Sequence, residues 1–63
     1  MPTNMEMSFM QKAALYKLLK LKRNNEKAGI KVEGLLDLIN ETEATMEAED
    51  VAWVEKKIAE LDQ

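Results

Sequence analysis

The chain has 63 residues, a formal net charge of −3, and neither cysteine nor histidine. A chain of this length fits one small domain, which buries only about 60% of the surface that its unfolded form exposes. Without these two residue types it has no disulfide, no thiolate metal site and no histidine base. Two glycines also leave no room for a glycine-rich phosphate loop. We therefore expect no enzymatic activity, no bound metal and no cofactor.

The composition predicts a single all-α domain over residues 1–63. Hydrophobic residues make up 46% of the chain and charged residues 33%, which is typical of a globular protein rather than a disordered one. Strong helix formers dominate, whereas β-branched and aromatic residues are few. The sequence has no apolar run of the ~20 residues that a membrane span needs, and no secretory signal at its start. We therefore expect a cytoplasmic protein without a transmembrane segment.

The first predicted helix covers residues 8–28, preceded by a flexible arm at residues 1–7. Ser8 and Gln11 match a capping box, in which each side chain bonds the backbone N–H of the other residue. The helix has an apolar stripe within about half of its circumference, at a spacing of ~100° per residue. This stripe consists of Met10, Ala14, Leu15, Leu18, Leu19 and Leu21.

The end of this helix is predicted at Gly29. Glycine adopts the positive φ that follows many helices, and an apolar residue after it, here Ile30, commonly contacts the last turn. Lys27 and its basic neighbours lie in the last two turns, where cations interact favourably with the helix dipole. These local signals place a turn between residues 29 and 31.

The second predicted helix covers residues 32–61 and is possibly bent or broken near residues 40–44. An unbroken helix would place three carboxylates in the middle of its apolar arc, namely Glu43, Glu47 and Asp50. A break would instead allow Asn40 or Thr42 to cap a third helix, with acidic residues in its first turn. The final segment has apolar residues at the 3-4-3 spacing of a coiled-coil seam. These residues are Val51, Val54, Ile58 and Leu61, with Trp53 beside them.

Charge divides the chain into a basic first half and an acidic second half. Residues 9–32 hold seven cations and one carboxylate, whereas residues 33–63 hold ten carboxylates and two lysines. Like charges three or four residues apart on a helix repel each other, so the basic helix is expected to lie beside the acidic one. The basic face is predicted at Lys12, Lys17, Lys20 and Arg23. The acidic face is predicted at Glu43, Glu47 and Asp50.

A short turn between the two helices predicts an antiparallel hairpin. Its register places Phe9 near Trp53 and Lys12 near Asp50, and the longer second helix extends past the start of the first. Because one chain cannot cover this apolar end, we predict a homodimer that forms a four-helix bundle with a two-fold axis. The residues predicted at the dimer or partner interface are Met10, Ala14, Leu15, Leu18, Val51, Trp53, Val54, Ile58 and Leu61.

Residues 28–46, with the sequence AGIKVEGLLDLINETEATM, resemble the helix-turn-helix of phage-repressor-like domains. In that family a turn with glycine and an apolar residue precedes one helix, and a Glu-Ala-Thr-hydrophobic stretch, here residues 43–46, opens the recognition helix. The resemblance implies DNA binding by that second helix. The recognition helix would, however, carry carboxylates that phosphates repel, at Glu43, Glu47, Glu49 and Asp50.

The sequence favours a small helical module that binds another protein, such as a regulator, an inhibitor or an accessory factor of bacterial or phage type. Tyr16 and Ser8 have no neighbouring base that could activate them, which argues against catalysis. The pI of about 4.9 favours a protein partner over nucleic acid. Two alternatives stay open. One is a nucleic-acid-associated regulator with a degenerate helix-turn-helix, and the other is an acidic mimic that occupies a nucleic-acid-binding protein.

Overall fold

The first helix, α1, spans Asn4–Lys27 and begins four residues earlier than expected. The computed structural model describes the backbone of residues 4–63 and the side chains of residues 6–63. Residues 4–7 are therefore helical, and only residues 1–3 of the expected arm lie outside the described chain. The predicted capping box is wrong, because Ser8 and Gln11 lie inside α1 and bond other parts of the chain.

The C-terminus of α1 is built as the sequence predicts. Gly29 has a φ of 73°, the conformation that glycine adopts without a steric penalty. Its N–H bonds the carbonyl of Glu26 at 3.1 Å, and the N–H of Ile30 bonds the carbonyl of Asn25 at 2.8 Å. This pair of hydrogen bonds is a Schellman motif, which satisfies the carbonyls that a helix end leaves open.

The second helix, α2, spans Leu35–Ala44, so the predicted long helix over residues 32–61 does not form. Gly34 is its N-cap with a φ of 80°, and its carbonyl accepts the first helical hydrogen bond, from Leu38. A residue with a side chain rarely adopts this φ. Gly34 therefore marks the start of α2.

The third helix, α3, spans Ala48–Glu60 and follows a break at residues 45–47. The break lies just beyond the predicted region of 40–44. The Thr42 and Thr45 hydroxyls each donate to a backbone carbonyl of α2, at 2.8 Å, instead of capping a new helix. Glu47, in an extended conformation, is the N-cap of α3. The three-helix alternative is therefore confirmed, but with a different capping residue.

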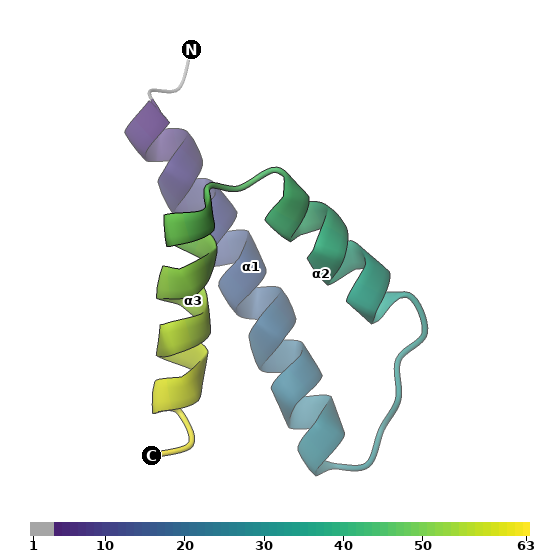
Figure 1. The fold of residues 1–63 in the computed structure, drawn as a ribbon. Helices are drawn as coiled ribbons and strands as arrows, with labels where there is room; N and C mark the ends of the chain where they lie inside the picture. Colours follow the sequence, from purple (N-terminus) through teal and green to yellow (C-terminus); the bar gives the residue numbers. More distant parts are fainter. Residues whose placement is uncertain (1–3) are drawn as a thin grey trace.

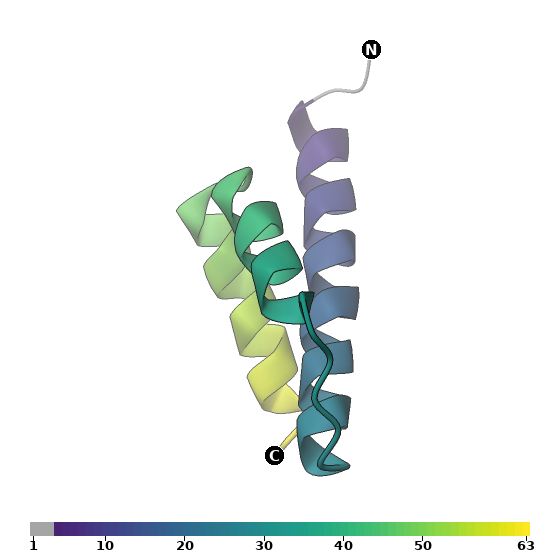
Figure 2. The ribbon, with the colours of Figure 1, turned by 90° about the vertical axis from the view of Figure 1, so that its right-hand side faces the viewer.

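The three helices run down, up and down, as Figure 1 shows. α1 packs against both of the other helices, whereas α2 and α3 have little contact with each other. Hydrogen bonds fix the direction of α3, because Asp50 at its start lies beside Ser8 and Asp62 at its end lies beside Arg23. α3 is therefore parallel to α1, while α2 is antiparallel to it. In the view of Figure 2, α2 and α3 both lie on the same side of α1.

Among the described side chains, the core contains one buried residue from each helix, namely Leu15, Ile39 and Val54. Around these three lies a shell of partly buried residues. The shell consists of Tyr16, Leu18, Leu19, Leu35, Met46, Val51 and Ile58. Met46 reaches this shell from the turn between α2 and α3, so the break itself contributes apolar surface to the core. This core is small, as expected for a chain of this length.

Many large apolar side chains stay exposed outside this thin core. They include Met7, Phe9, Met10, Leu21, Ile30, Val32, Leu36, Leu38, Trp53 and Leu61. Within residues 4–63, none of the helices combines the length and the hydrophobicity needed to cross a membrane. Exposed apolar side chains that gather in one place are candidates for a binding surface.

Candidate functional site

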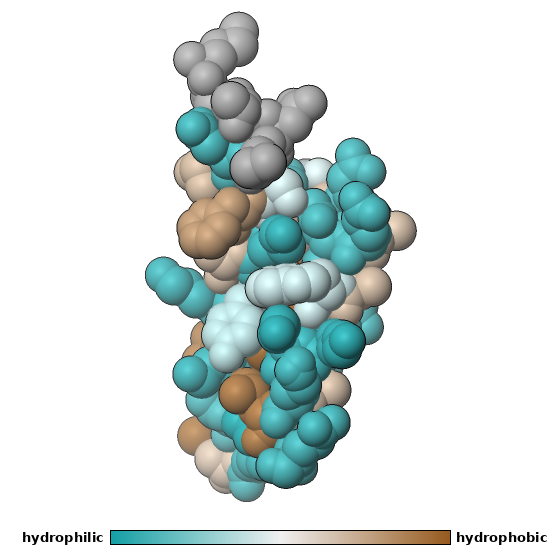
Figure 3. All heavy atoms as spheres, turned by 90° about the vertical axis from the view of Figure 1, so that its left-hand side faces the viewer, coloured by the Kyte–Doolittle hydropathy of each residue, from teal (hydrophilic) through white to brown (hydrophobic). Residues whose placement is uncertain are grey.

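The main candidate site is a groove between α1 and α3 that contains all three aromatic residues of the chain. We call it the aromatic groove. It is lined by Phe9, Lys12, Ala13, Tyr16, Lys17, Trp53 and Lys57, and encloses about 470 Å³. On the side of the molecule where α3 lies, brown and pale residues interrupt the hydrophilic surface (Figure 3). None of the described residues that line the groove is a carboxylate, so its walls are aromatic and positively charged.

The α1 side of the aromatic groove follows from helical spacing. Four of its residues occupy positions i, i+3, i+4 and i+7 of α1, so their side chains share one face of the helix. They are Phe9, Lys12, Ala13 and Tyr16. Tyr16 is partly buried against the core, whereas Phe9 is 71% exposed. The groove therefore reaches the core at Tyr16 and is open to solvent at Phe9.

The α3 side of the aromatic groove is formed by Trp53 and Lys57, which are one turn apart. The ammonium of Lys12 lies 4.8 Å from the centre of the Trp53 ring, and that of Lys57 lies 5.4 Å from it. Lys20 similarly lies 6.0 Å from the centre of the Tyr16 ring. Contacts of this kind contribute about 0.5–1 kcal/mol each at exposed sites. They keep positive charge against aromatic surface that still reaches solvent.

The lysines of the groove are only partly neutralised by the chain itself. Lys57 pairs with Glu60 at 3.6 Å. In the part of the chain with described side chains, no carboxylate lies within ion-pair distance of Lys12 or Lys17. Among the described side chains, the expected pairing of the basic first half with the acidic second half is seen at Asp62, which pairs with Arg23 and Lys27, and no ion pair joins α1 to α2. The excess positive charge of α1 therefore stays available at the groove.

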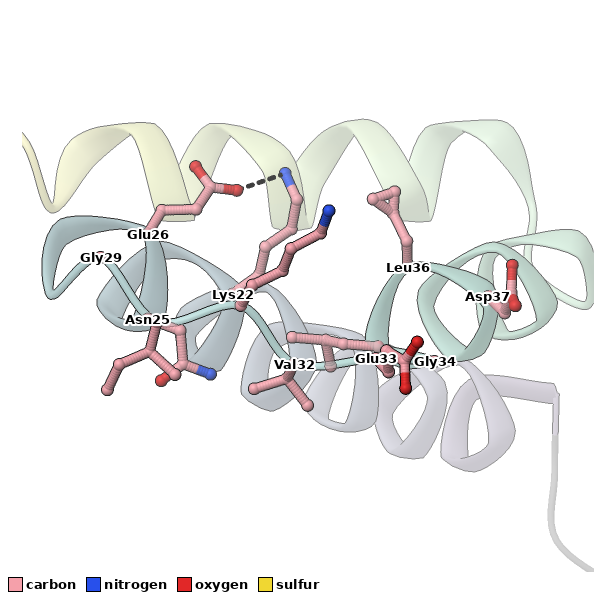
Figure 4. Close-up of a pocket in the computed structure, with 12 residues that line it drawn as sticks. Lys22, Asn25, Glu26, Gly29, Val32, Glu33, Gly34, Leu36 and Asp37 are labelled. Carbon is pink, nitrogen blue, oxygen red and sulfur yellow. Dashed lines mark ion pairs between the residues drawn. The ribbon is translucent and has the colours of Figure 1, made fainter.

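A second cavity, of about 550 Å³, lies between the 28–34 loop, α1 and α2. Figure 4 shows the ion pair of Lys22 and Glu26 at one end of it and Asp37 at the other. Its apolar lining includes Val32 and Leu36, which are both about half exposed. This cavity presents charges of both signs and therefore selects no ligand by charge.

The end of α3 is held to α1 by an ion-pair cluster that the sequence interpretation missed. The Asp62 carboxylate lies 2.7 Å from nitrogens of both Arg23 and Lys27, and Arg23 also bonds the carbonyl of Leu61. Hydrogen bonds from Arg23 and then Lys27 lower the pKa of Asp62 from 3.8 to about 2. The cluster was not predictable, because Asp62 meets Arg23 only after the chain turns back at residues 45–47.

The depressed pKa of Asp62 predicts how this cluster responds to acid. The charged carboxylate is favoured in the folded chain, so its contribution is complete above about pH 4 and is lost as the pH falls through about 2. NMR titration of the Asp62 side chain should give a midpoint near 2, and a midpoint closer to 3.8 in Arg23→Gln. Lys31→Gln, in the exposed loop, is the matched control. A wild-type midpoint near 3.8 would contradict the cluster.

The residues predicted at an interface divide into three groups. Two are fully buried within the chain, namely Leu15 and Val54. Three are partly buried against them, namely Leu18, Val51 and Ile58. The others are exposed, namely Met10, Ala14, Trp53 and Leu61. The predicted overhang of the last turns is wrong, because α3 runs back along α1, which buries Val54 and partly buries Ile58.

The predicted acidic face is not assembled. Glu43 lies on α2, Glu47 caps α3, and Asp50 accepts a hydrogen bond from the Ser8 hydroxyl at 2.7 Å. Among the described residues, no group of three carboxylates is placed to hold a metal ion. The predicted basic face is divided as well. Lys12, Lys17 and Lys20 lie at the aromatic rings, whereas Arg23 binds the end of α3.

The helix-turn-helix resemblance is out of register with the fold. Residues 43 and 44, which would open the recognition helix, are the last two residues of α2. The helix after the turn begins at Ala48 and carries Glu49 and Asp50 in its first turn. Carboxylates at this end would face the phosphates of a DNA groove. Comparison of the chain with protein-family models, curated proteins and solved structures found no match.

Proposed function

We propose that this chain is a non-enzymatic protein-binding module, which acts as a small regulator, inhibitor or accessory factor and holds its partner in the aromatic groove. The observation that supports this is the placement of the aromatics. A thin core would gain most from burying the largest apolar side chains, yet Phe9 is 71% and Trp53 48% exposed. Aromatic side chains are also the residue type most enriched at the centres of protein interfaces.

Site-specific photo-crosslinking tests this function. A benzoylphenylalanine at Ala13, inside the groove, should form a defined adduct with another protein in an extract of the source cells. The same group at Glu41, exposed on α2, should not. The adduct should be lost in Trp53→Ser, provided that circular dichroism shows that this variant is folded. Equal adducts from both positions, or adducts that persist in Trp53→Ser, would contradict binding at the groove.

We retain the homodimer as a proposal, but on different grounds from the sequence. With three helices in each chain, a dimer would contain six helices rather than the four of the predicted bundle. What now supports self-association is a second exposed stripe on α1. Met7, Ala14 and Leu21 are seven residues apart and so share a helix face. Sedimentation equilibrium should then give twice the 7.2 kDa chain mass, whereas Leu21→Glu should give the chain mass alone.

A further inference from the structure

We propose that the partner segment held in the aromatic groove is an acidic amphipathic helix, which places apolar side chains between the rings and carboxylates against the lysines. This inference rests on the proposed protein-binding function and specifies the chemistry of the partner. Three features of the groove support an acidic helix as its ligand, namely its charge, its shape and the positions of its lysines.

The positive charge of the aromatic groove favours an acidic ligand. Lys12 and Lys17 on α1 and Lys57 on α3 line it from both sides, and Glu60 at its edge offsets only Lys57. The chain as a whole carries −3, but charges farther away than the ~8 Å Debye length are largely screened at physiological salt. Of the carboxylates close to the groove, Asp50 is hydrogen-bonded to Ser8 and Glu60 pairs with Lys57. Among the described side chains, Lys12 and Lys17 therefore face a ligand without an ion-pair partner.

The shape of the groove suits a helix. α1 and α3 run in the same direction and contact each other along most of α3, from Asp50 beside Ser8 to Asp62 beside Arg23. Two packed helices leave a furrow between them that a third helix can follow, with apolar anchors at i, i+3, i+4 and i+7. The 470 Å³ between Phe9, Tyr16 and Trp53 gives those anchors an aromatic surface to fill.

The positions of the lysines disfavour nucleic acid. Single-stranded binding relies on bases that stack on open aromatic faces. The ammonium groups of Lys12 and Lys57 already lie over the Trp53 ring, so a stacking base would have to displace them. A carboxylate that pairs with either lysine leaves it against the ring.

Trp53 provides a label-free readout, because it is the only tryptophan and lies in the groove. The full chain is titrated with a designed tryptophan-free helical peptide that has leucines at i, i+3, i+4 and i+7 and glutamates on both flanks. Matched peptides carry glutamine or lysine in place of glutamate. We expect a blue shift of Trp53 emission with the acidic peptide and at least tenfold weaker binding of the glutamine peptide. The lysine peptide should not bind, and the preference should shrink at high salt.

Reversing the charge of two lysines in the groove tests whether peptide binding depends on charge or is nonspecific binding to exposed apolar surface. Lys12→Glu combined with Lys17→Glu should reverse the order, so that the lysine peptide binds best. Lys31→Glu, in the exposed loop, should leave the order unchanged. The proposal is overturned if the glutamine peptide binds as tightly as the acidic one, or if the double variant keeps the original order. Binding detected by calorimetry without a change in Trp53 emission also overturns it.

Two further ligands decide between partner classes in the same titration. Oligo-dT and vesicles containing phosphatidylglycerol should leave Trp53 emission unchanged, and tighter binding of either than of the acidic peptide would overturn the proposal. The outcomes also separate the two levels of inference. If photo-crosslinks form at Ala13 but the peptides show no preference for acid, protein binding stands and the acidic helix fails. If neither is seen, the groove is not a protein-binding site.

Discussion

Replacing Leu15 with alanine is expected to lower the free energy of unfolding by about 2–5 kcal/mol, the range for Leu→Ala changes in protein cores. Leu15 is fully buried and is the residue of α1 around which α2 and α3 pack. A 63-residue domain has a total stability of only about 3–9 kcal/mol, at ~0.05–0.15 kcal/mol per residue. The variant should therefore be largely unfolded at 37 °C, as measured by urea denaturation followed by circular dichroism.

Leu38→Ala is the matched control for this prediction. It removes the same atoms, but from α2, where Leu38 is 47% exposed. We expect a loss below about 1 kcal/mol, because little apolar surface is returned to water and no cavity forms. Equal losses in the two variants would show that α1 does not present Leu15 to the core.

Val54→Asp is expected to have the larger effect, because it places an unpaired carboxylate where no side-chain surface reaches solvent. Leaving a buried charge uncompensated costs about 3–5 kcal/mol, which is comparable with the whole stability of the chain. The variant should be unfolded at pH 7. Burial raises the pKa of the introduced carboxyl above its unfolded value, so protonation favours the folded state and helix content should recover as the pH falls toward 4.

The control for Val54→Asp is Ala52→Asp, which introduces the same group at an exposed position of α3. Its cost should be no more than about 0.7 kcal/mol, set by helix propensity alone. Sedimentation distinguishes the present fold from the predicted hairpin dimer. If Val54→Asp stays folded but changes from twice the chain mass to the chain mass, Val54 belongs to an interface between chains, and its place in the core is wrong.

Local sequence signals located the end of α1 correctly and its start incorrectly. The glycine at position 29 ends the helix through hydrogen bonds within a few residues, so the chain itself specifies it. The Ser8 and Gln11 pattern fits a capping box equally well, yet the Ser8 hydroxyl bonds Asp50 and the Gln11 amide bonds the Thr45 carbonyl. The same side chains serve either purpose, and only the approach of a distant segment decides between them.

Half of the aromatic groove could be recognised in the sequence and half could not. The spacing of Phe9, Lys12 and Tyr16 places them on one face of a helix. The hairpin register correctly placed Phe9 near Trp53, but it placed Lys12 rather than Ser8 beside Asp50. The predicted antiparallel register and the observed parallel one give the same neighbours at only one position along α1. Phe9 lies close to that position, so its neighbour was predicted correctly although the direction of α3 was not. Lys57 joins the groove because α3 runs parallel to α1.

The sequence by itself determined that the fold is all-helical, that α1 ends just before Gly29, and that Leu15 and Val54 lie on apolar helix faces. These features depend on backbone conformation and residue spacing over a few positions, which the sequence carries directly. The tertiary structure alone decided that the chain turns at residues 45–47. A continuous helix would keep its hydrogen bonds there but expose Val54 and Ile58, whereas the turn buries them with Met46 against α1. This burial depends on contacts between residues about 40 positions apart in the sequence. The direction of α3, the Asp62 cluster and the aromatic groove all follow from the same turn.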